Sequence, residues 1–181
     1  MVLAQLSQYI VSMIVENNPG VLFRVTGLIR RRGFNIDSIS VGPIDAGKLA
    51  RMTIVINGDE AILEQVVKQL HKLIEVIKIN RLEAKESVLR ELALVKIHAS
   101  ESRTRSDVMH YSRIFRARVI DVAQDSMILE ITGDPEKIDA FINLVRGYGI
   151  KEIARTGLSA LGRGTRSLKI EGGGTDGSFL R

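Results

Sequence analysis

The segment Met52-Thr-Ile-Val-Ile-Asn-Gly-Asp59 returns later in the chain as Met127-Ile-Leu-Glu-Ile-Thr-Gly-Asp134. Each copy is an apolar run rich in β-branched residues that ends in Gly-Asp, a pattern typical of a strand that leads into a helix. A segment repeated within one chain indicates that a structural unit is repeated. We therefore expect two tandem domains of one topology.

Apolar periodicity around the first copy predicts the element order βαββαβ. The expected strands cover residues 9–15, 36–41, 49–56 and 76–80, and the expected helices cover residues 21–32 and 59–73. Gly33 is expected to end the first helix, and the turn-rich residues 42–47 to join the two middle strands. This order is the ferredoxin-like arrangement, with two helices on one face of an antiparallel sheet.

The second copy predicts the same order. Its expected strands cover residues 92–98, 118–122, 127–131 and 150–154, with a helix over residues 104–115 and another that opens at Asp134-Pro135. The predicted fold class is α+β, with two tandem ferredoxin-like βαββαβ domains. The domains are expected at residues 1–81 and 92–164, with a charged connector at residues 82–91 and a Gly- and Ser-rich flexible tail at residues 165–181.

Composition excludes several classes of protein. The chain of 181 residues has 45% hydrophobic residues, as soluble globular proteins do, and no cysteine. Disulfides, thiol catalysis and cysteine-ligated metals are therefore excluded. The apolar runs are too short to span a bilayer, and the N-terminus lacks the features of a signal peptide. We expect a cytoplasmic protein with no membrane partner.

The sequence offers little for catalysis or for nucleic-acid binding. The three histidines, His71, His98 and His110, are scattered without a metal-binding spacing, and no phosphate-binding loop is present. We expect neither catalytic nor metal-ligating residues. Arg32-Gly33-Phe34 matches the start of an RNA-recognition motif, but the aromatic residues that should follow are missing. The net charge of +5 is spread along the chain, so no nucleic-acid partner is expected.

The loop Asn17-Asn-Pro-Gly20 lies between the first expected strand and helix, and the residues alone allow two interpretations of it. One is a tight turn that any strand-to-helix connection could use. The other is a cradle for a small carboxylate, in which the backbone N–H groups of Gly20, Val21 and Leu22 point outward at the start of the helix. Those groups lack partners within the helix, and the helix dipole is positive there.

Seven stretches together resemble one known family. They are residues 9–22, 31–41, 49–54, 64–73, 91–97, 114–122 and 153–157. The first unit resembles an ACT domain, a βαββαβ module that binds amino acids. The stretches run from Tyr9 toward Gly164, beyond the end of a single ACT domain, and the chain more narrowly resembles the small regulatory subunit of acetolactate synthase (acetohydroxyacid synthase).

The resemblance implies a protein without cofactors or catalysis of its own. Such a subunit docks on a separate catalytic subunit that carries thiamine diphosphate, Mg and FAD. It activates that subunit and confers feedback inhibition by valine or a related branched-chain amino acid. The family's ACT domains pair edge to edge in a homodimer and bind valine at their interface. The resemblance places Asn17, Gly20, Val21 and Leu22 of one chain there with Asn35 and Ile36 of the other.

Each residue type suits the role that the resemblance gives it. The N–H groups of residues 20–22 would bind the carboxylate, an amide oxygen of Asn17 or Asn35 would accept from the ammonium group, and Ile36 with Val41 would bound a small aliphatic pocket. Asn35 could instead serve only to form a turn after Gly33. One methylene changes binding in such a pocket by only about 1 to 3 kcal/mol, so selectivity among branched-chain amino acids should be modest.

Two further hypotheses concern partners. Phe115, Arg116 and the strand end at residues 153–157 of the second domain are candidates for the activating contact with the catalytic subunit. The alternative function is a stand-alone ACT-type amino-acid sensor that acts on another enzyme or regulator. The chain shows no helix-turn-helix pattern, which disfavours direct DNA binding by such a sensor.

Overall fold

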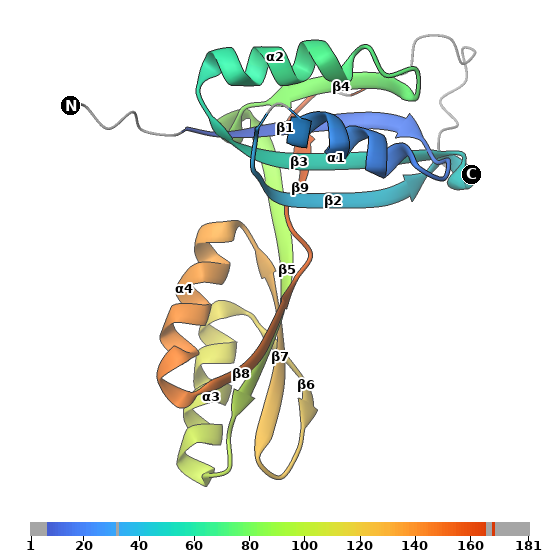
Figure 1. Cartoon of the computed structure of the whole chain (residues 1–181). Helices are drawn as coiled ribbons and strands as arrows, with labels where there is room; N and C mark the ends of the chain where they lie inside the picture. Colours follow the sequence, from blue (N-terminus) through green and yellow to red (C-terminus); the bar gives the residue numbers. More distant parts are fainter. Residues whose placement is uncertain (1–6, 32, 166–167, 169–181) are drawn as a thin grey trace, which may run out of the picture. The chain divides into compact units, whose positions relative to one another are not determined.

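Figure 1 shows a computed structural model of the chain, which describes residues 7–31, 33–165 and 168. The chain divides into one unit built from Met1–Val88 and Ala160–Arg181 and a second unit built from Leu89–Ser159. Residues 160–164, which we expected in the second domain, thus belong to the first unit. The expected tail at residues 165–181 lies outside the described residues, apart from residues 165 and 168.

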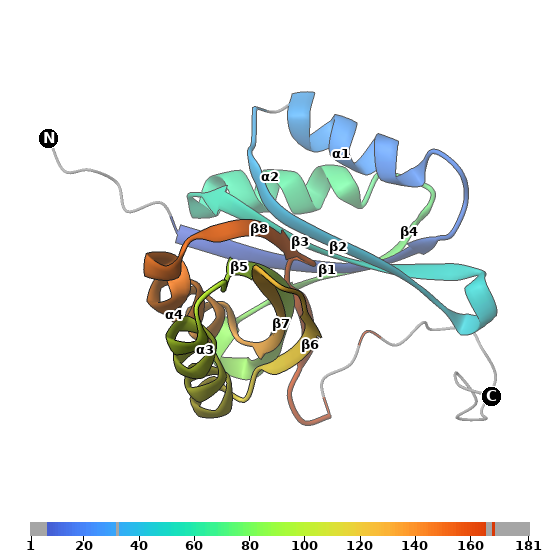
Figure 2. The same cartoon turned by 90° about the horizontal axis from the view of Figure 1, so that it is seen from below.

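The first unit has the βαββαβ order. It consists of β1 (Ser7–Glu16), α1 (Val21–Arg31), β2 (Ile36–Ile44), β3 (Leu49–Gly58), α2 (Glu60–Leu70) and β4 (Val76–Leu82), with short 3-10 turns at Asp45–Gly47 and Ala84–Glu86. The strand order is β2-β3-β1-β4, and all neighbouring strands are antiparallel. Figures 1 and 2 show α1 and α2 on the same face of this sheet.

The core of the first unit forms between that face and the helices. Alternate residues of β1, Val11, Met13 and Val15, are fully buried there because successive side chains of a strand point to opposite faces. The helices contribute their own apolar stripes, including Val25 and Ile29 of α1 and Val66 and Leu70 of α2. The core is aliphatic, as the scarcity of aromatic residues requires.

Gly33 ends α1 as predicted. Its N–H donates to the carbonyl of Arg30 at 2.9 Å, and the N–H of Phe34 donates to the carbonyl of Ile29 at 3.3 Å. These two bonds form a Schellman motif, in which the residue after the helix adopts a left-handed conformation. Gly33 has φ +76°, which glycine adopts without a Cβ clash. The chain therefore turns sharply from α1 into β2.

The turn between β2 and β3 is shorter than expected. We predicted a loop at residues 42–47, but β2 continues to Ile44 and only residues 45–48 lie between the strands. Asp45, Ala46 and Gly47 all have positive φ. Pro43 lies inside β2, where it cannot donate a hydrogen bond. A proline is tolerated there because β2 is an edge strand of the sheet.

The second unit repeats the arrangement, which confirms the predicted pair of ferredoxin-like domains. Its elements are β5 (Ser87–His98), α3 (Ser102–Phe115), β6 (Arg118–Val122), β7 (Ser126–Gly133), α4 (Pro135–Val145), a 3-10 turn at Arg146–Tyr148 and β8 (Ile150–Arg155). The strand order β6-β7-β5-β8 matches that of the first sheet position by position. A further strand that we did not predict, β9 (Ser159–Gly162), pairs with β5.

The start of α4 and the core of the second unit are as the sequence predicted. Asp134 caps α4 by accepting from the N–H of Lys137 at 2.9 Å, with Pro135 at the first helical position. Ile138, Phe141, Ile142 and Val145 of α4 are buried. The rings of Phe115 and Phe141 meet edge to face at 5.4 Å between centroids.

A partly buried ion cluster fastens β8 within the second unit. Arg155 of β8 donates from Nε and Nη2 to the two carboxylate oxygens of Glu91 at 2.7 and 2.6 Å, and from Nη1 to Asp139 of α4 at 2.7 Å. The Glu91 side chain is only 6% exposed. The hydrogen bonds to Glu91 and then to Asp139 raise the pKa of Arg155, so this cation persists at every working pH.

Replacing Arg155 by methionine should lower the free energy of unfolding by about 3 kcal/mol, because it leaves the Glu91 carboxylate buried without a cation. Urea denaturation of the full chain, followed by circular dichroism, measures this loss. Arg118→Met is the matched control. The Arg118 side chain is 79% exposed and lies 3.7 Å from Glu130, so this pair should contribute less than about 1 kcal/mol. Equal losses in the two variants would contradict the role assigned to the buried pair.

Candidate functional site

The loop after β1 is tied to the turn between β2 and β3. The backbone N–H of Asn17 donates to the carbonyl of Lys48 at 3.0 Å, and its side-chain Nδ2 donates to the carbonyl of Gly47 at 2.8 Å. Both contacts use donors of Asn17. The amide oxygen is the part of the side chain that can still accept a hydrogen bond from a ligand.

Gly20 shapes the start of α1. It has φ +88°, a conformation that other residues rarely adopt, and its carbonyl accepts from the N–H of Arg24 at 3.0 Å as the first bond of the helix. The N–H of Val21 donates to the carbonyl of Asn18 at 3.3 Å. Val21 therefore closes a turn, and its N–H is not the free donor that we expected.

The loop therefore has features of both interpretations, the tight turn and the carboxylate cradle. The loop is a turn, and it also leaves the N–H groups of Gly20 and Leu22 without a backbone acceptor among the described residues. These two donors stand at the positive end of the α1 dipole. A small carboxylate is the kind of group that such an end can bind.

Asn35 and Ile36 follow the Schellman motif at the other end of α1. The Asn35 side chain is exposed, and its Nδ2 makes only a long contact of 3.4 Å with Asp37 Oδ1. Ile36 opens β2 and packs partly against the core. The amide of Asn35 is therefore positioned by the turn, yet is free to point its oxygen at a ligand.

One chain does not bring the predicted site residues together. Residues 17–22 lie at the N-terminal end of α1 and residues 35–36 follow its C-terminal end. The helix has 11 residues, which at 1.5 Å per residue separates its ends by roughly 16 Å. An amino acid cannot bridge that distance. A site that uses both groups needs two chains, with their α1 helices running in opposite directions.

The surface beside α1 and β2 exposes several large apolar side chains. Phe23 is 79% exposed, and Leu22 and Val41 are each 45% exposed. A cavity of about 590 Å³ runs along this surface, lined by Phe23, Thr26, Gly27, Arg30, Arg31, Phe34, Asn35 and Ile36. Exposed aromatic and aliphatic side chains beside an edge strand are typical of a surface that meets another protein.

Comparison with known proteins assigns both units to one family. Residues 11–78 match the model of an AHAS small subunit-like ACT domain, and residues 90–164 match the model of the small subunit of acetolactate synthase. The chain is 52% identical over 160 residues to the probable acetolactate synthase small subunit of Methanothermobacter thermautotrophicus, which covers 88% of this chain and 95% of that relative. The chain belongs to the acetolactate synthase small-subunit family.

Two other members of the acetolactate synthase small-subunit family support this assignment. The acetolactate synthase small subunit of Mycobacterium leprae is 48% identical over 163 residues, covering 90% of this chain and 96% of the relative. The crystal structure of the small subunit from Thermotoga maritima matches with a TM-score of 0.82 at 41% identity, covering 88% of this chain and 99% of that one. The family and the tandem fold predicted from the sequence are thereby confirmed.

Within residues 7–31, 33–165 and 168, no three His, Asp or Glu side chains gather as they would around a metal ion. In the same part of the chain, no helix is long and apolar enough to cross a membrane.

Replacing Gly20 by alanine should destabilise the chain by about 1 kcal/mol, because a Cβ is strained in the left-handed region. The new methyl group would meet nothing within 4 Å, so a clash plays no part. Thermal unfolding measures the effect. Gly42→Ala is the matched control, since Gly42 also has open space around it but lacks a positive φ. A loss as large for Gly42→Ala would show that the conformation of Gly20 is not the cause.

Proposed function

We propose that the chain is the regulatory subunit of acetolactate synthase, which activates the catalytic subunit and makes it subject to feedback inhibition by valine. The observation that carries this proposal is the family match of both units over nearly the whole described chain. The free N–H groups beside Gly20 and the exposed amide of Asn35 support it, because they suit the carboxylate and the ammonium group of an amino acid.

The amino-acid site is proposed to form between two chains. Gly20 and Leu22 of one chain donate to the carboxylate, and the Asn17 oxygen lies in the same loop. Asn35 and Ile36 of the second chain supply an acceptor for the ammonium group and an aliphatic wall. The roughly 16 Å between the ends of α1 supports this division, since an antiparallel pair of helices places one end beside the other.

The homodimer is proposed to form through β2. This edge strand has no neighbour on its outer side among the described residues, and pairing with the β2 strand of a second chain would satisfy its outward N–H and C=O groups. The exposed side chains of Leu22, Phe23 and Val41 would be buried at the same time. Burial of each such side chain contributes about 1.5 to 3 kcal/mol.

Catalysis belongs to the partner in this proposal. Thiamine diphosphate, Mg²⁺ and FAD are bound by the catalytic subunit, and this chain binds no cofactor. The second unit is proposed to provide the activating contact, but Phe115 is unsuited to it because its ring packs on Phe141 in the core. The exposed side chains of Arg116, Ile120 and Val122 are better placed to meet a partner.

Addition of this chain to the purified catalytic subunit from the same source should increase acetolactate formation from pyruvate, and valine should reverse the increase. The assay is a valine titration with and without the chain. Stimulation reversed by valine supports both roles. A folded chain that neither stimulates nor responds to valine would contradict the proposal and favour a stand-alone amino-acid sensor.

Asn35→Ala should raise the valine concentration for half-maximal inhibition by at least about tenfold while leaving activation intact. The reason is the loss of a hydrogen bond to a charged group, which contributes about 1.5 to 3 kcal/mol. Asn143→Ala, at an exposed asparagine of α4, is the matched control and should leave the titration unchanged. Loss of activation together with inhibition in folded Asn35→Ala would contradict the separation of the two functions.

A further inference from the structure

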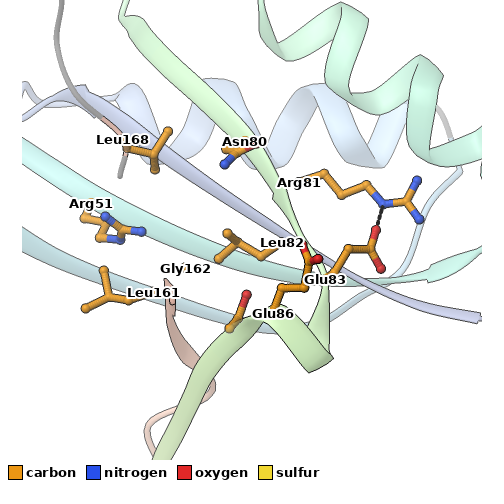
Figure 3. A pocket seen from close by; sticks show the side chains of 10 residues that line it. Arg51, Asn80, Arg81, Leu82, Glu83, Glu86, Leu161, Gly162 and Leu168 are labelled. Atoms are coloured by element: carbon orange, nitrogen blue, oxygen red, sulfur yellow. Dashed lines mark ion pairs between the residues drawn. The ribbon is translucent and has the colours of Figure 1, made fainter. Parts of the chain in front are cut away.

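A second cavity lies in the first unit, away from the residues assigned to valine. It has a volume of about 550 Å³ and is lined by Arg51, Asn80, Arg81, Leu82, Glu83, Glu86, Ser87, Leu161, Gly162 and Leu168. Figure 3 shows these side chains around the ends of β9 and β4. The volume is within the range of small-molecule sites, about 300 to 1,000 Å³.

Two arginines line this cavity, and Arg51 is the one with which no carboxylate among the described residues pairs. Its Nη2 donates to the backbone carbonyl of Ala160 at 3.1 Å, while its Nε is buried without an acceptor. Burial lowers the pKa of Arg51, because desolvation disfavours the charged form. A half-buried guanidinium with an unused donor is suited to an anion, since binding one offsets the cost of burying the charge.

The lining also includes a serine hydroxyl and three leucine side chains. The hydroxyl of Ser87 is buried without a hydrogen-bond partner, so it too can bond to a ligand once side chains adjust. Leu82, Leu161 and Leu168 provide an aliphatic surface. Together these residues suit a molecule that has an anionic head and an apolar body.

The opposite end of the cavity is acidic. Figure 3 shows Arg51 on one side of Leu82 and the pair of Arg81 and Glu83 on the other side. Arg81 is already engaged by Glu83, at 2.8 Å from its Nε, and by Glu60. Glu86 adds a further carboxylate to the lining. A ligand with a second negative charge would meet repulsion at this end.

We propose that this cavity binds an aliphatic monocarboxylic acid, with its carboxylate on Arg51 and its hydrocarbon chain on Leu82, Leu161 and Leu168. A dicarboxylate of equal carbon number binds more weakly because its second charge faces Glu83 and Glu86. The site is distinct from the amino-acid site at α1 and does not depend on the function proposed for that site. Its recognition elements all belong to the first unit.

Isothermal titration of the full chain with isovalerate tests the proposal, with glutarate as the dicarboxylate of equal carbon number. We expect saturable binding of isovalerate and binding of glutarate that is at least about tenfold weaker, a difference of about 1.4 kcal/mol. Arg51→Gln should weaken isovalerate binding at least about tenfold. Arg103→Gln removes an exposed arginine of α3 and should leave binding unchanged.

A second variant keeps the test decisive if Arg51→Gln impairs folding. Leu161 is 57% exposed, so Leu161→Glu should fold and should repel the ligand through a new carboxylate. The absence of isovalerate binding to the folded chain would overturn the proposal. So would binding that survives both Arg51→Gln and Leu161→Glu, or binding that is lost in Asn35→Ala, because the acid would then occupy the amino-acid site.

Discussion

In the first unit, the face of the sheet opposite α1 and α2 must also be shielded from water. A two-layer fold normally exposes that face to water, yet Ile10, Ile14 and Val55 on it are no more than 5% exposed. The hydrogen bond from Arg51 to the carbonyl of Ala160 joins β3 on this face to the returning chain, and Ala160 is itself buried. This contact ties a segment distant in sequence to the first unit, and Arg51 lines the second cavity together with Leu161 and Gly162 of that segment.

Local and periodic features of the sequence predicted most of the fold. The repeated Gly-Asp segment predicted both units, and Gly33 and Asp134-Pro135 marked helix boundaries through backbone effects that act within a few residues. The strand β9 was missed because four residues are too short to show a period. The early start of β5 at Ser87 was missed because Arg90 and Glu91 interrupt the apolar pattern that indicates a buried strand.

The candidate site was predictable in its residue types but not in its hydrogen bonds. Asn-Pro-Gly before a helix indicates a turn and free donors, and both are present around Gly20. Whether the N–H of Val21 points outward or closes the turn onto Asn18 depends on backbone angles that the sequence does not specify. The length of α1, which separates the two halves of the site, follows directly from the positions of Gly20 and Gly33.

β1 adjoins both proposed ligand sites. It ends at Glu16, directly before the loop that carries Asn17, and its residues Ile10 and Ser12 pair in register with Leu82 and Asn80 of β4, which line the second cavity. A strand buried on both faces cannot slip by a residue without exposing its core side, so only small displacements can pass along it. If occupation of one site displaces β1, the free energy of binding at the other site changes, and the effect is equal in both directions. Coupling between an amino acid and a monocarboxylic acid would then pass through β1, one of the two inner strands of this sheet.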